Sequence, residues 1–206
     1  MEILTAGRHT ASTEVHRSAE VQLVCSMTRI IALLALIVCA GPATVAAQTA
    51  TAPALKAAYL LNFVRFTEWP AAVLASSAPI TLCVVNNREV SSQLAELTKG
   101  RLVEGHALVV AAPKPDAFGS CHLLFASDLD AQAATALMVS VAGKPVLTVS
   151  DMDKFAQRGG VAHFFVDKGT LVFAINLEAA QRANVRLSHK LLSLAKIVKE
   201  DRDAGR

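Results

Sequence analysis

The sequence predicts an α/β layered domain with a mixed, mainly parallel sheet flanked by helices. Three observations support this fold class. Strand-like runs alternate with helical patterns from residue 54 onward. The first run, 80–85, is continuous and rich in β-branched residues, as in strands buried on both faces of a sheet. A turn-type tripeptide, Asp167-Lys168-Gly169, joins two later runs and indicates a β-hairpin, which makes the sheet mixed.

The first predicted element is an amphipathic helix over residues 54–69, which Pro70 ends. One face of this helix carries Leu55, Tyr59, Phe63 and Phe66. We expect this aromatic stripe to lie in the core, in preference to lining a groove for a partner.

The next elements are four strands with helices between them, and we expect these four strands to form the parallel part of the sheet. The predicted strands are 80–85, 106–112, 121–126 and 145–149. The predicted helices are 87–98, closed by Gly100, then 130–139 and a short helix over 152–157.

Gly159-Gly160 then punctuates the chain before the hairpin of 161–166 and 170–175. A short helix is expected over 177–183. Ser188 is predicted to cap a last helix whose inward positions are Leu191, Leu192, Ala195 and Val198. The polar tail, 200–206, is expected to fray.

Composition excludes several classes of protein. The 206 residues are 53% hydrophobic and 18% charged, which is too apolar for a disordered chain. The net charge of +3 comes from Lys and Arg residues that are scattered along the sequence. No aromatic-flanked basic cluster is present, so we expect no nucleic acid partner.

The amino-terminal segment has the features of a secretory signal peptide. Ile30–Ala40 is an uninterrupted apolar run behind Arg29 and is too short to span a bilayer, which takes roughly 20 residues. Val45-Ala46-Ala47 offers small residues for cleavage, so residues 1–47 are predicted to be removed. The less favoured alternatives are a retained anchor and lipidation at Cys39.

Residues 1–26 fit this signal poorly, and we interpret them as an over-extended gene start or an unstructured leader. After cleavage, residues 48–53 are expected to be a flexible leader, residues 54–199 the domain, and residues 200–206 the tail. A periplasmic protein without membrane insertion is expected.

Cys83 and Cys121 remain after this cleavage, 38 positions apart. Disulfides persist in exported proteins, so a bridge between these two residues is favoured over two buried free thiols. Zinc is not expected, because two Cys residues without spaced His partners do not complete a tetrahedral site.

Familiar catalytic motifs are missing from the sequence. It contains no dinucleotide-binding or P-loop glycine motif and no G-x-S-x-G elbow. His122 and His163 fall inside the predicted strands, where a hydrogen-bonded structural role is expected. The acidic pairs that follow two of the strands are expected to cap helices, and they are Asp128 with Asp130 and Asp151 with Asp153. The residues therefore favour binding over catalysis, with no cofactor or metal.

Several phrases, taken in order from about Leu55 to Ala195, resemble the YfiR/HmsC-like family of periplasmic regulators. The phrases are Lys56–Phe63 with Glu68-Trp69-Pro70, Ile80–Val85, Cys121–Phe125, Leu147–Asp151, Phe155 with Gly159-Gly160, Phe173–Ala180 and Ser188–Ala195.

The resemblance implies a non-enzymatic repressor. Such a protein binds the periplasmic sensor region of an inner-membrane diguanylate cyclase, lowers cyclic di-GMP and restrains biofilm formation. It also implies a homodimer, and Cys83 and Cys121 match the positions of a family disulfide. Asn176 and Ala180 are predicted to lie near the partner surface, the alternative being that Asn176 only caps a helix.

Two departures from the family pattern stand out. A second Cys pair near Gly159-Gly160, found in some members, is missing, so redox control through it is excluded. Ala174 also stands where the family often has Glu, which puts in doubt any partner contact by that carboxylate.

Two other functions remain open at this stage. One is a periplasmic small-molecule sensor or carrier with a pocket at the carboxyl ends of the strands. The other is a hydrolase that uses Asp128, Asp151 or His122.

Overall fold

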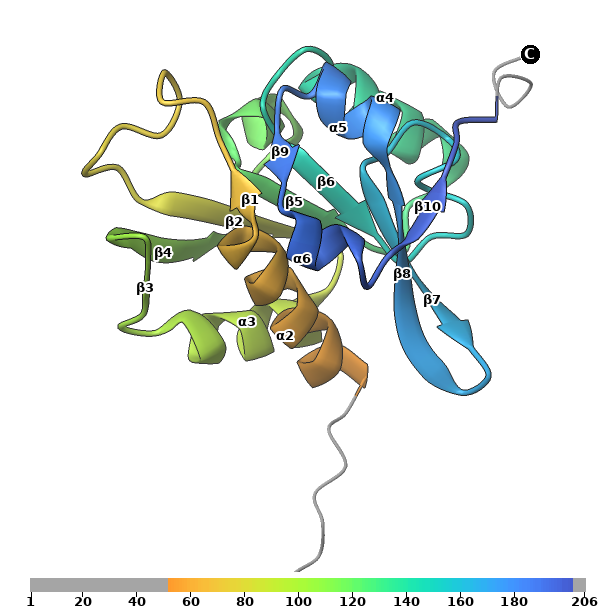
Figure 1. Cartoon of the computed structure of the whole chain (residues 1–206), viewed down its shortest axis with the longest axis horizontal. Coiled ribbons are helices and arrows are strands. Elements are labelled where there is room, and N and C mark those ends of the chain that lie inside the picture. The colour runs from red at the N-terminus through yellow and green to blue at the C-terminus, as the bar shows by residue number, and fades with distance from the viewer. Residues whose placement is uncertain (1–51, 202–206) are drawn as a thin grey trace, which may run out of the picture. The chain divides into compact units, whose positions relative to one another are not determined.

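A central sheet of eight strands organises the protein, whose structure, a computed structural model, describes residues 52–201 (Figure 1). In the order in which they lie side by side, the strands are β10 (Lys196–Val198), β8 (Thr170–Asn176), β7 (Ala162–Asp167), β6 (Leu147–Ser150), β5 (Leu123–Ala126), β2 (Ile80–Val85), β4 (His106–Ala111) and β3 (Leu102–Val103). The predicted signal peptide, residues 48–51 of the leader and residues 202–206 of the tail lie outside the described residues.

Strand directions confirm the predicted mixed, mainly parallel sheet. The strands β4, β2, β5, β6 and β7 are all parallel to their neighbours in this group. The antiparallel pairs are β7 with β8 and β3 with β4, whereas β10 runs parallel to β8. The chain therefore goes from β2 outward to β4 and then returns past β2 to β5, β6 and β7.

Helices cover both faces of this sheet, as Figure 1 shows. The helices are α2 (Ala52–Arg65), α3 (Arg88–Thr98), α4 (Ala131–Val141), α5 (Leu177–Arg182), α6 (His189–Leu192) and the 3₁₀ turn η1 (Pro115–Ser120). Alternate residues of β2 and β5 enter two different cores. The larger core lies beneath α2 and α3, and the smaller one lies beneath α4 and η1.

The aromatic residues of the predicted stripe pack in the larger core, Phe63 fully buried and Tyr59 and Phe66 partly buried against it, whereas Leu55 lies outside that core. The ring of Phe63 stacks on Phe164 of β7 at a centroid distance of 5.7 Å and meets Phe173 of β8 edge-on at 4.9 Å. Tyr59 packs against the same two rings. Aromatic pairs at these distances add roughly 0.5–1.5 kcal/mol each beyond the buried area. They fasten α2 to the hairpin.

Cys83 and Cys121 form a disulfide in the smaller core. Cys83 lies in β2, Cys121 precedes β5, and their Cα atoms are 5.9 Å apart. Both residues are almost fully buried beside Leu137 and Val141 of α4. The bridge therefore lies between the sheet and the helix that covers it.

Local sequence signals account for several element boundaries. Oxygen atoms of Asn87, Asp130 and Ser188 accept hydrogen bonds from backbone N–H groups in the first turns of α3, α4 and α6. The hairpin loop consists of two residues, Lys168 (φ 49°) and Gly169 (φ 80°), because Asp167 already pairs with Thr170. Two consecutive positive φ angles match the twist of an antiparallel pair.

The predicted first helix is wrong at both ends. It begins at Ala52 with Pro53 in its first turn, a position that proline tolerates, so the predicted leader is shorter. It ends at Arg65, because the next residues form the short strand β1 (Thr67–Glu68), which pairs with β9 (Arg186–Leu187). This small second sheet was not predicted, since its strands have only two residues each.

Two further predictions of helices are wrong. Residues 152–157 form turns, with Lys154 at φ 54°, because this segment is hydrogen-bonded to the sheet. The last helix is confined to α6, and residues 196–198 become β10. Pairing with the free edge of β8 overrides the helical spacing of a segment that contains Ile197 and Val198.

The disulfide leads to a first prediction. Reduction of the wild-type mature chain should lower its free energy of unfolding by up to about 4 kcal/mol, because the closed loop restricts the unfolded chain. Urea unfolding followed by circular dichroism, with and without reductant, measures this difference. The Cys83→Ala/Cys121→Ala variant is the control and should lose stability without responding to reductant. Equal stability of oxidised and reduced wild type would contradict the prediction.

Candidate functional site

The carboxyl ends of β2, β5 and β6 form the point at which the strand order reverses. In open α/β sheets, ligands bind in the crevice outside such a point. Here three polar residues follow the three strands: Asn87 after β2, Ser127 after β5 and Asp151 after β6. The structure therefore brings together side chains that lie 24 to 64 positions apart in the sequence.

These three side chains form one network with Lys56 of α2. The ammonium of Lys56 lies 2.5 Å from Oδ2 of Asp151, and both side chains are four-fifths buried. The hydroxyl of Ser127 donates to the same oxygen at 3.0 Å. The side-chain amide of Asn87 donates to Ser127 Oγ at 3.4 Å. The chain's own lysine therefore occupies the place where such a sheet would hold a ligand.

This arrangement bears on the acidic pairs that the sequence singled out. Asp130 caps α4, as predicted, through a 2.7 Å bond from the Ala133 N–H group. Asp151 does not cap a helix, because its carboxylate is bonded to Lys56 and Ser127. Asp128 is exposed, and its backbone has φ 52°.

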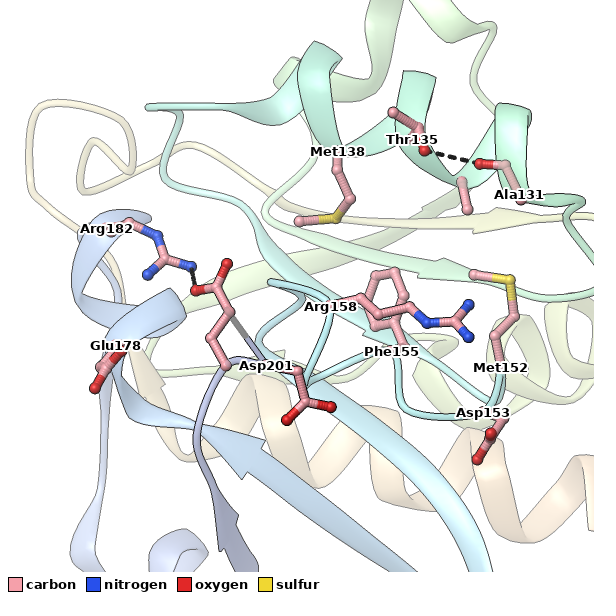
Figure 2. Close-up of a pocket in the computed structure, with 12 residues that line it drawn as sticks. Ala131, Thr135, Met138, Met152, Asp153, Phe155, Arg158, Glu178, Arg182 and Asp201 are labelled. Atoms are coloured by element: carbon pink, nitrogen blue, oxygen red, sulfur yellow. Dashed lines mark hydrogen bonds and ion pairs between the residues drawn. The ribbon is translucent and has the colours of Figure 1, made fainter. Parts of the chain in front are cut away.

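A cavity of about 950 Å³ opens beside this network, between α4, the turn of residues 152–159, α5 and the last described residues (Figure 2). The residues that line it are Ala131, Ala134, Thr135, Met138, Met152, Asp153, Phe155, Arg158, Glu178, Arg182, Glu200 and Asp201. A pocket at the carboxyl ends of the strands was predicted for a small-molecule sensor. The cavity lies on the α4 side of that edge.

The cavity has apolar walls and a charged rim. Met138, Met152 and Phe155 supply the apolar surface. On the rim, the guanidinium of Arg182 pairs with Glu200 at 2.5 Å. Both side chains are partly exposed, so this ion pair contributes little stability by itself.

The residues after β10 also close one side of the cavity. The backbone N–H group of Asp201 donates to Gln157 O at 2.8 Å, next to the ion pair of Glu200. Glu200 and Asp201 were expected to fray with the tail, and these bonds hold them in place.

The turn of residues 152–159 forms the floor of the cavity, and both backbone polar groups of Ala156 are bonded to side chains of the β7–β8 hairpin. The N–H group of Ala156 donates to Nδ1 of His163 at 3.4 Å, and the carbonyl oxygen of Ala156 accepts from the side chain of Asn176 at 2.8 Å. Gly160 follows the turn because a Cβ atom there would overlap the ring of Phe155. This explains why the Gly-Gly segment follows Phe155.

Asn176 and Ala180, predicted to lie near the partner surface, are both buried. Asn176 is fully buried, and its Oδ1 atom accepts from the Ala179 N–H group, so the capping alternative is confirmed. Ala180 is 3% exposed. Neither side chain reaches the surface in this structure. Two exposed residues of the same helix, Glu178 and Arg182, line the cavity instead.

The position of Ala174 clarifies the departure from the family pattern. Its side chain is 1% exposed and lies directly across from His163 in the β7–β8 pair. Position 174 therefore faces the interior beside a histidine, which makes it unsuited to direct contact with a partner.

The half-buried His122 and the buried His163 both have the hydrogen-bonded structural role that was predicted. Nδ1 of His122 accepts from the Thr81 N–H group at 3.0 Å, which places its proton on Nε2. Burial lowers the pKa of His122, although the hydrogen bond to Val73 O opposes this shift. Burial likewise lowers the pKa of His163, although the charge of Asp153 opposes it.

Within residues 52–201, no group of three or more His, Cys, Asp or Glu side chains is placed to hold a metal ion. In the same part of the chain, no helix is long and apolar enough to cross a bilayer. Asp151 and His122, considered for a hydrolase, have separate hydrogen-bond partners.

The fold and site define a class of α/β domain in which Lys56 fills the position at the strand-order reversal and a cavity lies beside it. Comparison with protein families identifies the family to which this domain belongs. The sequence model described as YfiR/HmsC-like matches residues 53–196, and the chain belongs to this family of periplasmic regulators. The disulfide agrees with an oxidising compartment of this kind.

Two solved structures show weaker similarity. A conserved domain protein from Vibrio cholerae O1 biovar El Tor strain N16961 has 15% sequence identity and a TM-score of 0.44 over 73% of this chain. The ABC domain in complex with L-Trp from Streptococcus pneumonia has 14% identity and a TM-score of 0.40 over 57% of this chain. The chain covers 60% of the first protein and 55% of the second, which is less than two thirds of either.

The clamp on Ala156 leads to a second prediction. Asn176→Ala should lower the free energy of unfolding by about 2–3 kcal/mol, because it removes a helix cap and leaves a buried carbonyl unpaired. Urea titration measures the change. Gln181→Ala, on the exposed side of α5, is the matched control and should change stability by less than about 0.5 kcal/mol. An Asn176→Ala protein as stable as this control would contradict the structural role.

The lowered histidine pKa values give a third prediction. The unfolded histidines titrate near pH 6.5 and take up protons before the folded ones. The stability that neutral histidine contributes is therefore complete above that pH and is lost as pH falls toward the lowered folded values. Melting temperatures measured from pH 7.5 to about 5 should fall, and less steeply for His163→Asn. His189→Asn, at an exposed position, should follow wild type, and a slope unaffected by His163→Asn would refute this account.

Proposed function

We propose that this protein is a non-enzymatic periplasmic repressor of an inner-membrane diguanylate cyclase. In this proposal it binds the sensor region that the cyclase exposes to the periplasm, lowers cyclic di-GMP and restrains biofilm formation. The family match over residues 53–196 is the observation that carries the proposal. The hydrogen bonds that engage Asp151, His122 and His163 support a role without catalysis.

The cavity rim is the surface that we assign to this partner. Glu178 and Arg158 are exposed there, beside the apolar surface of Met138 and Met152. An apolar centre with a charged rim is the usual composition of a protein interface. The assignment also keeps the prediction that the hairpin exit and α5 lie near the partner, with exposed residues replacing Asn176 and Ala180.

Repression requires only a difference in affinity. A regulator that binds the inactive conformation of the sensor region more tightly shifts the population toward it by that difference. The disulfide and the Ala156 clamp hold the walls of the cavity before the partner arrives, which lowers the ordering cost of binding.

The fourth prediction tests the partner and its surface. The oxidised mature chain should co-purify with the periplasmic sensor region of a diguanylate cyclase from the same host. The double variant Glu178→Lys/Arg158→Glu should weaken that complex at least about tenfold, because it reverses two charges on the cavity rim. Calorimetry on the purified pair measures the affinity.

Glu96→Lys on α3 is the matched control, since Glu96 is exposed on the opposite side of the sheet. It should bind as wild type does. Failure of the wild-type protein to bind any such sensor region of its host would reject the proposal. Equal loss of binding in both variants would reject only the assigned surface.

A second candidate function is a periplasmic small-molecule sensor, and the cavity favours it. Its volume lies within the usual range for ligand pockets, about 300–1,000 Å³. Ligand-dependent melting in a metabolite screen would support this function. If no compound shifts the melting temperature and a sensor region binds tightly, the sensor function is rejected and the repressor function is retained.

A further inference from the structure

Positive charge is concentrated in one surface segment near the carboxyl end. Residues 186–199 contain Arg186, Lys190, Lys196 and Lys199 and no Asp or Glu. The other described residues, 52–185 with 200–201, contain 11 Lys and Arg against 13 Asp and Glu. The surplus of basic residues, which the sequence analysis treated as scattered, is therefore carried by this one segment. All four basic side chains are exposed.

The same segment presents apolar side chains to solvent. Leu194 is 73% exposed, the highest value for any large apolar residue in the described part of the chain, and Ile197 is 49% exposed. Backbone bonds from Leu194 and Ala195 continue the turn of α6, so Lys190 precedes Leu194 by one helical turn. We call the exposed Lys, Arg, Leu and Ile residues of this segment the basic rim. They are Arg186, Lys190, Leu194, Lys196, Ile197 and Lys199.

Part of the basic rim lies on an edge of the sheet, namely Lys196 and Ile197 in β10. Lys190 lies in α6, and Arg186 lies in β9 of the small second sheet, in register with Glu68. β10 is the outermost strand, and Figure 1 shows it leading away from α6 beside β8. Ile197 pairs in register with Ile175, whereas Lys196 reaches the opposite face, where its ammonium lies 5.8 Å from the ring centre of Phe165. A basic side chain therefore lies on one face of this edge, and an apolar side chain lies on the other.

The composition of the rim indicates what it contacts. Centres of protein interfaces are rich in aromatic residues and Arg and poor in Lys. The rim has three Lys, one Arg and two aliphatic side chains. Lysine on an edge strand also discourages the addition of a strand from another protein. Point charges with short aliphatic anchors instead suit a surface of anionic lipid headgroups.

We propose that the basic rim docks reversibly onto anionic phospholipid, with Leu194 and Ile197 entering the headgroup layer. The lysines supply long-range attraction, and the two apolar side chains supply a shallow anchor. This is contact at the surface of a membrane and is distinct from insertion across it. The inference goes beyond the proposed repressor function and does not depend on it, since the interaction requires no partner protein.

The fifth prediction concerns vesicles. The oxidised mature chain should co-sediment with phosphatidylcholine vesicles that contain about 40 mol% phosphatidylglycerol, and not with phosphatidylcholine alone. Binding should fall steeply between about 0.05 and 0.5 M salt, because salt screens the lysines. Lys190→Gln/Lys199→Gln should weaken binding about 25-fold, since each lysine near an anionic surface contributes a factor of about five. Leu194→Ser/Ile197→Ser should also weaken it.

Matched controls separate the rim from general charge and apolarity. Val166→Ser changes a side chain that is 69% exposed on the hairpin, and Lys99→Gln/Lys114→Gln removes two charges elsewhere. Both should bind vesicles as wild type does, and all variants should keep the wild-type melting temperature. Absent or lipid-independent binding of wild type, or rim variants that bind normally, would overturn the proposal. If no protein binds vesicles but the variants of the basic rim lose their binding to a sensor region, the surface contacts a protein and the proposal is rejected.

Discussion

The burial of one face of α2 against the β7–β8 hairpin positions much of the rest of the molecule. Phe63 and Tyr59 contact Phe164 and Phe173, which join the first helix to strands more than 100 positions later. With α2 held there, Lys56 reaches Asp151 at the strand-order reversal. The same packing therefore stabilises the core and fills the place where many α/β proteins hold a ligand.

With that place filled, the cavity of this edge lies between α4, the turn of residues 152–159 and α5. The floor of the cavity depends on Ala156, whose N–H and carbonyl groups are bonded to His163 and Asn176. Buried polar groups that satisfy one another in this way specify a single arrangement. The family-like phrases around Phe155, Gly160 and Asn176 thus have a common physical basis: they shape and anchor one turn.

Much of the fold was predictable from the sequence, because its signals are local. The run 80–85 matches β2 to the residue, and Asn87 and Asp130 begin α3 and α4 where capping residues are expected. The disulfide partners followed from the predicted removal of residues 1–47, which leaves only Cys83 and Cys121. By contrast, β1, β9 and β10 have only two or three residues, and their pairing partners lie far away in the sequence. Local spacing carries no information about such contacts.

The candidate site was less predictable than the fold for the same reason. Asp151 had the sequence context of a helix cap. Its ion pair with Lys56 depends on the position of α2 in the folded chain, which the local sequence does not indicate. Asn176 and Ala180 were predicted to lie near a partner surface, but both side chains are buried, and their depth depends on how α5 packs. The exposed rim residues Glu178 and Arg182 carried no distinguishing motif. Glu178 and Arg182 can be recognised as cavity residues only once α4 and α5 are seen to line the same cavity.

The position of the disulfide connects the history of the chain with the shape of its surface. Cys83 and Cys121 support the small core under α4, whose other side faces the cavity, whereas the larger core under α2 contains neither of them. The larger core therefore packs without any covalent link of its own. The wall that α4 gives to the cavity gains covalent support only when the two thiols are oxidised, so the redox state of the surroundings bears on one face of the sheet more than on the other.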